Sequence, residues 1–139
     1  NIDNLSVGET EDPSISRMTI VVRGTDKVLE QVAKQLNRLV DVIRVIDITQ
    51  GEFIERELAL IKVKTDTTTR FEIMQIAEIF RAGIVDVSTH SMTIEATGKE
   101  DKIHAITNML KTYGILEIAR TGTVALLRDS QPKKPMDEN

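Results

Sequence analysis

The sequence predicts an α+β fold in which helices pack across antiparallel strands. The chain has 139 residues, of which 40% are hydrophobic but only 3% are aromatic, so its core must come from aliphatic side chains that suit strands. Segments in which apolar residues alternate are interspersed with segments in which they recur every three or four positions, the periods of strands and helices. The same order of segments occurs twice along the chain, which predicts two similar units.

The N-terminal half is predicted to contain two strands, a helix and a third strand. Alternation of Met18, Ile20 and Val22 indicates a strand. Thr25 is suited to cap the helix that follows, and a β-branched run after the helix favours a further strand. The four elements are expected at residues 1–8, 16–23, 26–39 and 40–46.

The C-terminal half is predicted to have the order β-α-β-β-α-β. Its first helix is expected to begin with a capping box formed by Thr69 and Glu72 and to end at Gly83. Its second helix is expected to end at Gly114. Helix stripes are expected at Ile73, Ile76, Ala77 and Phe80, then at Ile103, Ile106, Leu110 and Tyr113. The strands are expected at residues 57–64, 84–89, 92–97, 115–119 and 124–127.

The β-α-β-β-α-β order over residues 55–128 is the ferredoxin-like order. Residues 1–49 have the same order without its first strand and first helix, and residues 50–54 are expected to be a linker. Because that first strand lies in the middle of the sheet, we expect the N-terminal unit to be incomplete and its natural chain to begin further upstream. Residues 129–139, which contain prolines and lysines, are expected to form a disordered tail.

Composition argues against several classes of function. The formal net charge is −4, and the chain has no basic stripe or set of stacking aromatics of the kind that nucleic-acid binders use. The absence of cysteine excludes disulfides, thiolate metal sites and a cysteine nucleophile, and it favours a reducing, cytoplasmic compartment. His90 and His104 have no clustered ligands in the sequence, so we expect neither a metal site nor a catalytic residue.

Five segments resemble the small regulatory subunit of acetohydroxyacid synthase, also called acetolactate synthase. Among them are SVGETEDPSISRMTIVV, ERELALIKV and EIFRAGIVDV, and the resemblance extends from Asn1 to about Arg128. It implies that the N-terminal unit is an ACT domain, a ferredoxin-like module that binds a small amino acid. It also implies a second ferredoxin-like domain after the linker. The matching segments are residues 6–22, 28–45, 55–63, 78–87 and 117–126.

The resemblance further implies a function without chemistry on this chain. Such subunits bind and activate the catalytic subunit of the enzyme and confer feedback inhibition by valine in branched-chain amino-acid biosynthesis. The catalytic partner is implied to use thiamine diphosphate, FAD and Mg²⁺. Valine is implied to lie between two ACT domains of a homodimer, and Asn1 and Ile2 match a strand start that contacts it. Without the loop that follows the domain's first strand, we expect this chain to bind valine weakly or not at all.

Several alternatives remain open at the level of sequence. A stand-alone ACT-type amino-acid sensor that acts on another partner is the main rival, while an enzyme on this fold lacks any visible catalytic cluster. Glu55, Arg56 and Glu57 suit either a recognition patch or, as the default, ordinary surface charge. Arg81 and Arg120 each suit either a local ion pair or a partner's carboxylate. The strand at 57–64 is apolar on both sides, which predicts self-association through one sheet face or edge.

Overall fold

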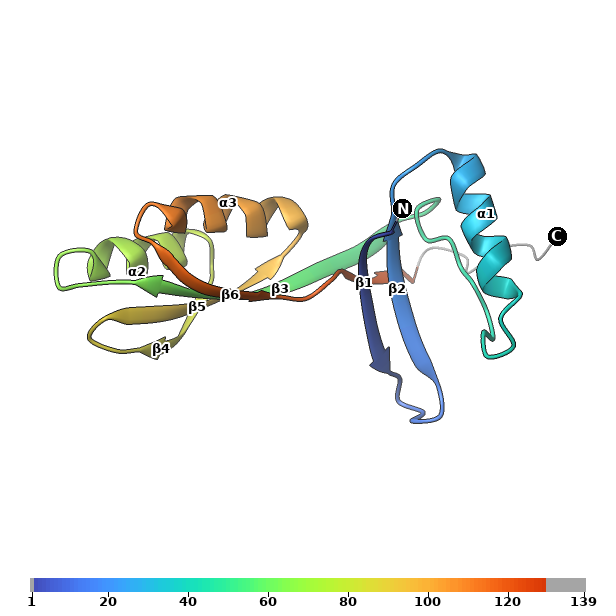
Figure 1. Cartoon of the computed structure of the whole chain (residues 1–139), viewed down its shortest axis with the longest axis horizontal. Helices are drawn as coiled ribbons and strands as arrows, with labels where there is room; N and C mark the ends of the chain where they lie inside the picture. The colour runs from blue at the N-terminus through green and yellow to red at the C-terminus, as the bar shows by residue number, and fades with distance from the viewer. Residues whose placement is uncertain (1, 130–139) are drawn as a thin grey trace. The chain divides into compact units, whose positions relative to one another are not determined.

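The computed structural model describes residues 2–129 and divides the chain into two compact units (Figure 1). Unit 1 consists of Asn1–Ile54 with Val124–Asn139, and unit 2 consists of Glu55–Thr123. The described strands pair in antiparallel fashion in each unit, and the predicted α+β fold is confirmed. The disordered tail that was predicted lies, from residue 130 on, outside the described residues.

Unit 2 has the ferredoxin-like arrangement. Its strands lie in the order β4-β5-β3-β6, so that β3 and β5 are central, and β7 also pairs with β3. This order follows from the sequence because two β-α-β crossovers place each helix on the same side of the sheet. Its elements are β3 (Phe53–Lys64), α2 (Arg70–Ile79), β4 (Gly83–Val87), β5 (Ser91–Gly98), α3 (Glu100–Lys111) and β6 (Ile115–Arg120). The first two residues of β3 and the whole of β7 (Val124–Leu127) belong to unit 1.

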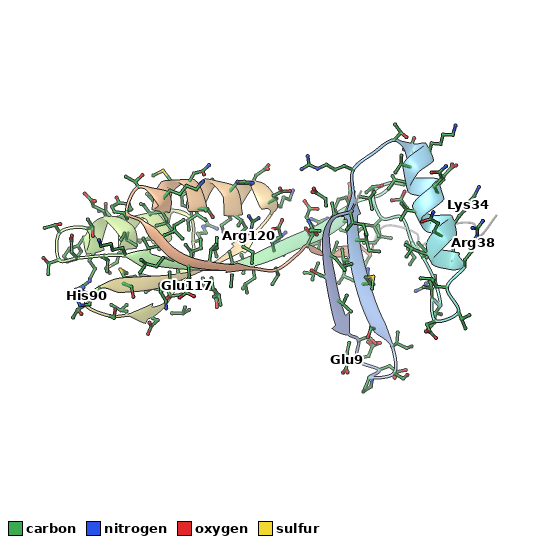
Figure 2. All side chains as sticks on the ribbon, viewed as in Figure 1. Glu9, Lys34, Arg38, His90, Glu117 and Arg120 are labelled. Atoms are coloured by element: carbon green, nitrogen blue, oxygen red, sulfur yellow. The ribbon has the colours of Figure 1, made fainter. Side chains whose placement is uncertain are left out.

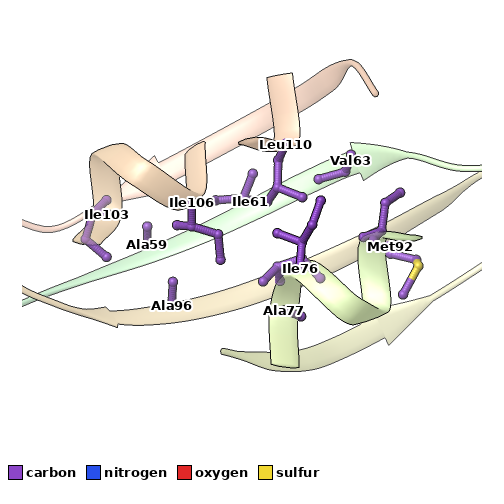
Figure 3. Close-up of a cluster of buried hydrophobic side chains, with 12 residues drawn as sticks. Ala59, Ile61, Val63, Ile76, Ala77, Met92, Ala96, Ile103, Ile106 and Leu110 are labelled. Carbon is purple, nitrogen blue, oxygen red and sulfur yellow. The ribbon is translucent and has the colours of Figure 1, made fainter. Parts of the chain in front are cut away.

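The hydrophobic core of unit 2 lies between one face of the sheet and its two helices (Figure 3). Alternate residues of β3 point into it, and Ile61 and Val63 are completely buried. Successive turns of α3 contribute Ile103 and Ile106, which are also completely buried, so the predicted helical stripes are confirmed. The remaining members are Ala59, Ile73, Ile76, Ala77, Met92, Ile94, Ala96 and Leu110.

The first turn of α2 is capped three residues earlier than predicted. Asp66 Oδ1 accepts a hydrogen bond from the Thr69 amide at 2.9 Å, and Thr69 Oγ1 accepts one from the Asp66 amide at 3.0 Å. This reciprocal pair is a capping box, whereas the predicted box of Thr69 and Glu72 is wrong because the Thr69 hydroxyl is already engaged. Hydrogen bonds from the Thr68 hydroxyl and then the Thr69 amide lower the pKa of Asp66 from 3.8 to about 2.

The end of α2 also differs from the prediction. Arg81, rather than Gly83, takes the left-handed conformation, with φ at 54°. The Ala82 amide donates to the Ala77 carbonyl at 2.8 Å and the Arg81 amide to the Glu78 carbonyl at 3.0 Å, which is the pattern of a Schellman motif. Gly83 is free to begin β4 because the turn has been completed two residues before it.

Unit 1 contains a β-hairpin and a helix. β1 (Ile2–Glu9) and β2 (Ser16–Val22) form a two-stranded antiparallel sheet, as predicted for the described residues. The helix α1 (Asp26–Asn37) begins at Thr25, whose hydroxyl accepts a hydrogen bond from the Val28 amide at 3.4 Å. The predicted cap at Thr25 is therefore confirmed.

The strand predicted at residues 40–46 is wrong. The run is irregular, and among its residues only Ile46 makes an isolated bridge, while the side chains of Val40 and Ile43 are 99% and 78% exposed. Strand propensity expresses pairing and packing on a pleated surface rather than a backbone preference. The β-branched run stays irregular because it pairs with neither strand of the β1–β2 hairpin.

β3 begins inside the segment predicted as a linker. Phe53 and Ile54 belong to the strand, and the Glu52 carbonyl just before them accepts a hydrogen bond from the Arg128 amide at 3.0 Å. Pairing with β7 extends β3 in this direction, a long-range effect that local composition does not indicate. The predicted division into domains at residues 1–49 and 55–128 stays a prediction.

Candidate functional site

The first candidate site is the end of the hairpin where β1 begins. Ile2 lies opposite Val22 in the ladder, and the register shifts between Ile2 and Asn4. Such a bulge bends a strand and redirects a side chain. Ile2, which was predicted to contact a ligand, has 62% of its surface exposed. Asn1, the other predicted contact, lies outside the described residues.

An ion pair joins the two strands at the same end. Arg23 Nε lies 3.3 Å from Asp3 Oδ1, and the Arg23 side chain is 76% exposed while that of Asp3 is 31% exposed. An exposed pair of this kind contributes only about 0–1 kcal/mol, so a ligand can compete for either partner at small cost. One carboxylate and one guanidinium therefore lie at the strand end that also carries the exposed Ile2, and these charges can pair with the ammonium and carboxylate groups of an amino acid.

Sequence reasoning missed Asp3 and Arg23 because their proximity depends on the hairpin register. The turn after Arg23 is held by Gly24, whose φ is 152°. A Cβ at Gly24 would lie 3.0 Å from Cβ of Val28, so the close approach of this turn to α1 requires glycine. The glycine was visible in the sequence, but only as the residue that ends a strand.

One face of the hairpin is apolar and exposed. Leu5 and Val7 on β1 are 47% and 59% exposed, and Met18 on β2 is 52% exposed. The register pairs Val7 with Met18 and Leu5 with Ile20, so these side chains share one face. A two-stranded sheet is marginally stable by itself, and a contiguous exposed apolar face is typical of a protein contact surface.

In unit 2 one of the charges at the start of β3, that of Glu57, is buried. Glu57 is only 6% exposed, and its Oε1 accepts a hydrogen bond from Arg120 Nη2 at 3.2 Å. The prediction of a solvated cluster is therefore wrong for Glu57, because β3 pairs with β6 and brings Arg120 to its side. Of the alternatives left open for Arg120, the structure shows the local ion pair.

The two histidines lie on different elements of unit 2. His90 lies in the turn between β4 and β5 (Figure 2), and His104 lies within α3. Among residues 2–129, no group of three or more His, Cys, Asp or Glu side chains is placed to hold a metal ion. No helix in this same range is long and apolar enough to cross a membrane.

Two family models match different parts of the chain. The model described as "Small subunit of acetolactate synthase" matches residues 56–129, and the "AHAS small subunit-like ACT domain" matches residues 1–44. The two matches together account for most of the chain, and they divide it close to the boundary between units 1 and 2.

Relatives and a solved structure agree with these models. The acetolactate synthase small subunit of Aquifex aeolicus is 54% identical over 99% of this chain and 72% of its own length. The Bacillus subtilis small subunit is 50% identical over 96% of this chain and 78% of its own length. The crystal structure of the small subunit from Thermotoga maritima matches with a TM-score of 0.85 and 47% identity, covering 92% of this chain and 80% of that one. The chain therefore belongs to the acetolactate synthase small-subunit family.

Proposed function

We propose that this chain is the non-catalytic regulatory subunit that binds and activates the catalytic subunit of acetolactate synthase and makes it sensitive to valine. The observation that carries the proposal is the family match, which extends over both units at about 50% identity to named small subunits. The thiamine diphosphate, FAD and Mg²⁺ of the reaction belong, in this proposal, to the catalytic subunit. Both subunits are proposed to work in the cytoplasm.

Valine is proposed to bind at the end of the hairpin, at Asn1 and Ile2. Arg23 would hold its carboxylate and Asp3 its ammonium group, in place of the 3.3 Å ion pair that they form with each other. Ile2 would pack against the branched side chain of the ligand. The exposed face of Leu5, Val7 and Met18 supports a further part of the proposal, a homodimer formed through the N-terminal units.

The proposal is tested by the rate of acetolactate formation by a catalytic subunit of the family, alone and with this chain. We expect the chain to co-purify with the catalytic subunit and to raise its rate. Because this chain is expected to bind valine weakly, we expect valine to lower the raised rate only at high concentration. Absence of both co-purification and activation would contradict the proposal. Binding of valine without binding of the catalytic subunit would instead favour the rival function, a stand-alone amino-acid sensor.

The valine site is tested separately by calorimetric titration of two variants. Arg23→Ala removes the proposed carboxylate partner and is expected to weaken valine binding at least tenfold, because a charge-assisted hydrogen bond is lost. Lys27→Ala, also exposed but on α1, is the matched control and is expected to leave binding unchanged. Equal binding by both variants would place the site elsewhere while leaving the subunit's activating role intact.

A further inference from the structure

Helix α2 has exposed apolar side chains on the half of its surface that faces away from the core. Phe71 and Ile79 are 72% and 76% exposed, and Met74 is 41% exposed. These residues lie at the first, fourth and ninth positions of a run that begins at Phe71, so they share the half of the helix opposite Ile73 and Ile76. Solvent-facing positions of such a helix are normally polar. We call Phe71, Met74 and Ile79 the α2 patch.

Helix α3 covers the same face of the sheet (Figure 1) and provides a direct comparison. Among its large apolar side chains only Met109, at 51%, is exposed. Its other outward positions, such as Asp101, His104 and Asn108, are polar and exposed. The apolar outer surface is therefore a property of α2 and is not required for a helix to pack on this sheet. Exposed apolar patches of this kind are typical of protein contact surfaces.

A positive charge lies at the end of the same helix. Arg81 has the left-handed φ of 54°, a conformation that residues other than glycine seldom adopt and that is often found at functional sites. Its side chain is exposed and forms no ion pair with any residue between 2 and 129, although Glu78 is close in sequence. Arg120, by contrast, is paired with Glu57. Of these two arginines, Arg81 is the one whose charge is available to the carboxylate of another protein.

We propose that the α2 patch and Arg81 bind the catalytic subunit of acetolactate synthase, at an apolar surface that has a carboxylate opposite Arg81. This inference rests on the proposed function, and it names the part of unit 2 that makes the contact. Arginine can pair with a carboxylate through two parallel hydrogen bonds. Aromatic residues and arginine are also enriched among the residues that contribute most to protein interfaces. Because Ile79 lies two residues before Arg81, one partner surface can contact both.

A second copy of this chain is a less suitable partner for α2. If a twofold axis runs along the helix, Arg81 of one copy lies level with Arg81 of the other. If the two helices are antiparallel and Phe71 packs against Ile79, Glu72 of each copy lies level with Glu78 of the other. Both arrangements bring like charges together, which is unfavourable at an interface. Charge complementarity thus favours a different protein, and the catalytic subunit is the partner that the proposed function requires.

The first test removes the charge without destabilising the helix end. Arg81→Gly takes away the guanidinium and relieves the left-handed φ, so the full chain is expected to be at least as stable as the wild type in thermal unfolding. In calorimetric titration it is expected to bind the catalytic subunit at least about tenfold more weakly, and the concentration that gives half-maximal activation should rise equally. A defect in folding cannot produce weaker binding together with higher stability. Unchanged binding by this variant would overturn the charge contact.

Two further variants control for the loss of an arginine. Lys111→Ala removes an exposed cation from α3, and its binding is expected to stay within about twofold of the wild type. Arg81→Lys keeps the charge but not the paired hydrogen bonds, and it is expected to bind between the wild type and Arg81→Gly. Equal losses in Lys111→Ala and Arg81→Gly would show a general effect of net charge and would overturn the proposal.

The second test addresses the apolar part of the surface. Ile79→Ser is expected to weaken binding at least about tenfold, whereas Met109→Ser, a matched exposed position on α3, is expected to leave it unchanged. Equal effects of the two substitutions would overturn the proposal. Sedimentation of each variant alone is expected to give the mass of the wild-type chain. A lower mass for Ile79→Ser would show that a second copy covers α2, and it would overturn the proposal too.

The same measurements separate this inference from the proposed function. If the wild-type chain binds and activates the catalytic subunit, and Arg81→Gly and Ile79→Ser do so equally well, the regulatory function stands and the contact at α2 is overturned. If the wild-type chain neither binds nor activates the catalytic subunit, both are overturned. The expected result is activation by the wild type, a raised half-activating concentration for these two variants, and none for Lys111→Ala or Met109→Ser.

Discussion

Units 1 and 2 are built from the same kinds of elements, but they differ in how much of their apolar surface they bury. Unit 2 has a sheet with two central strands, two helices and a core of fully buried aliphatic residues. Unit 1 has a two-stranded sheet and one helix, and the buried hydrophobic residues among its described residues are two alanines, Ala33 and Ala125. The hairpin in unit 1 has exposed apolar side chains, such as Val7 and Met18, that can pack against another protein surface.

This difference shows that apolar periodicity yields stable structure only where pairing and packing partners are present. In unit 2 each predicted strand has a neighbouring strand, and each helical stripe faces the sheet. In unit 1 an equally β-branched run at residues 40–46 remains irregular. Unit 2 therefore forms a hydrophobic core from its own residues, whereas unit 1 is expected to become more stable when a ligand or a second protein chain binds it.

The largest expected difference between the units concerns core substitutions. Ile61→Ala removes a completely buried side chain of unit 2 and is expected to lower the free energy of unfolding by about 3 kcal/mol. Leu5→Ala in unit 1, where the side chain is 47% exposed, is expected to cost under about 1 kcal/mol. Urea unfolding followed by circular dichroism measures both values, and similar costs would contradict the difference between the units.

The two cross-strand ion pairs provide a second comparison. Glu57→Gln in unit 2 disrupts a pair whose carboxylate is 6% exposed and is expected to destabilise the protein by about 1–2 kcal/mol, a value reduced because Arg120 is partly solvated. Asp3→Asn in unit 1 disrupts an exposed pair and is expected to change stability by less than about 0.5 kcal/mol. A larger loss in Asp3→Asn would show that unit 1 depends on its surface charges.

The helix ends differ in a way that glycine substitution can detect. Arg81 after α2 has a left-handed φ of 54°, so Arg81→Gly is expected to stabilise the protein by about 1 kcal/mol. Arg38 after α1 is right-handed, with φ at −76°, so Arg38→Gly is expected to destabilise it by about 0.5–1 kcal/mol. Thermal unfolding of both variants gives the two signs, and a loss of stability in Arg81→Gly would show that the Arg81 side chain has another role.

The smallest expected effect is the pH dependence from Asp66. Its pKa is lowered from 3.8 to about 2 by hydrogen bonds from Thr68 and Thr69. Because the folded-state pKa is the lower one, the stabilisation is complete above the unfolded-state value and is lost as the pH falls toward about 2. The stability difference between the wild type and Asp66→Ala should therefore be constant near neutral pH and shrink below pH 4. A constant difference down to pH 2 would contradict this assignment.

How much the sequence predicted depends on whether the deciding contacts were local. The helical stripe of Ile103, Ile106 and Leu110 and the cap at Thr25 were predicted because each is encoded within a few residues. The burial of Glu57 was missed because Arg120 is 63 positions away in the chain. The ion pair of Asp3 with Arg23 was missed for the same reason, since it depends on the hairpin register.

Two errors at α2 had a different cause. Thr69 and Glu72 have the spacing of a capping box, but Asp66 forms the box with Thr69 instead. The Asp66 carboxylate accepts a hydrogen bond from the Thr69 amide, and the Thr69 hydroxyl accepts one from the Asp66 amide. Arg81 took the left-handed position although Gly83 was nearby, because the Schellman hydrogen bonds of Ala82 and Arg81 fix where the helix ends. In both places neighbouring residues competed for the same role, and hydrogen-bond geometry decided between them.

Hydrogen exchange of the full chain, read residue by residue, tests the difference between the units most directly. We expect amides of the central strands β3 and β5 to exchange only through global unfolding, and those of β1 and β2 to exchange through local opening and to be much less protected. Addition of the catalytic subunit and valine should then slow exchange mainly in β1 and β2. Equal protection of the two units in the chain alone, with no change on addition of either, would contradict the account.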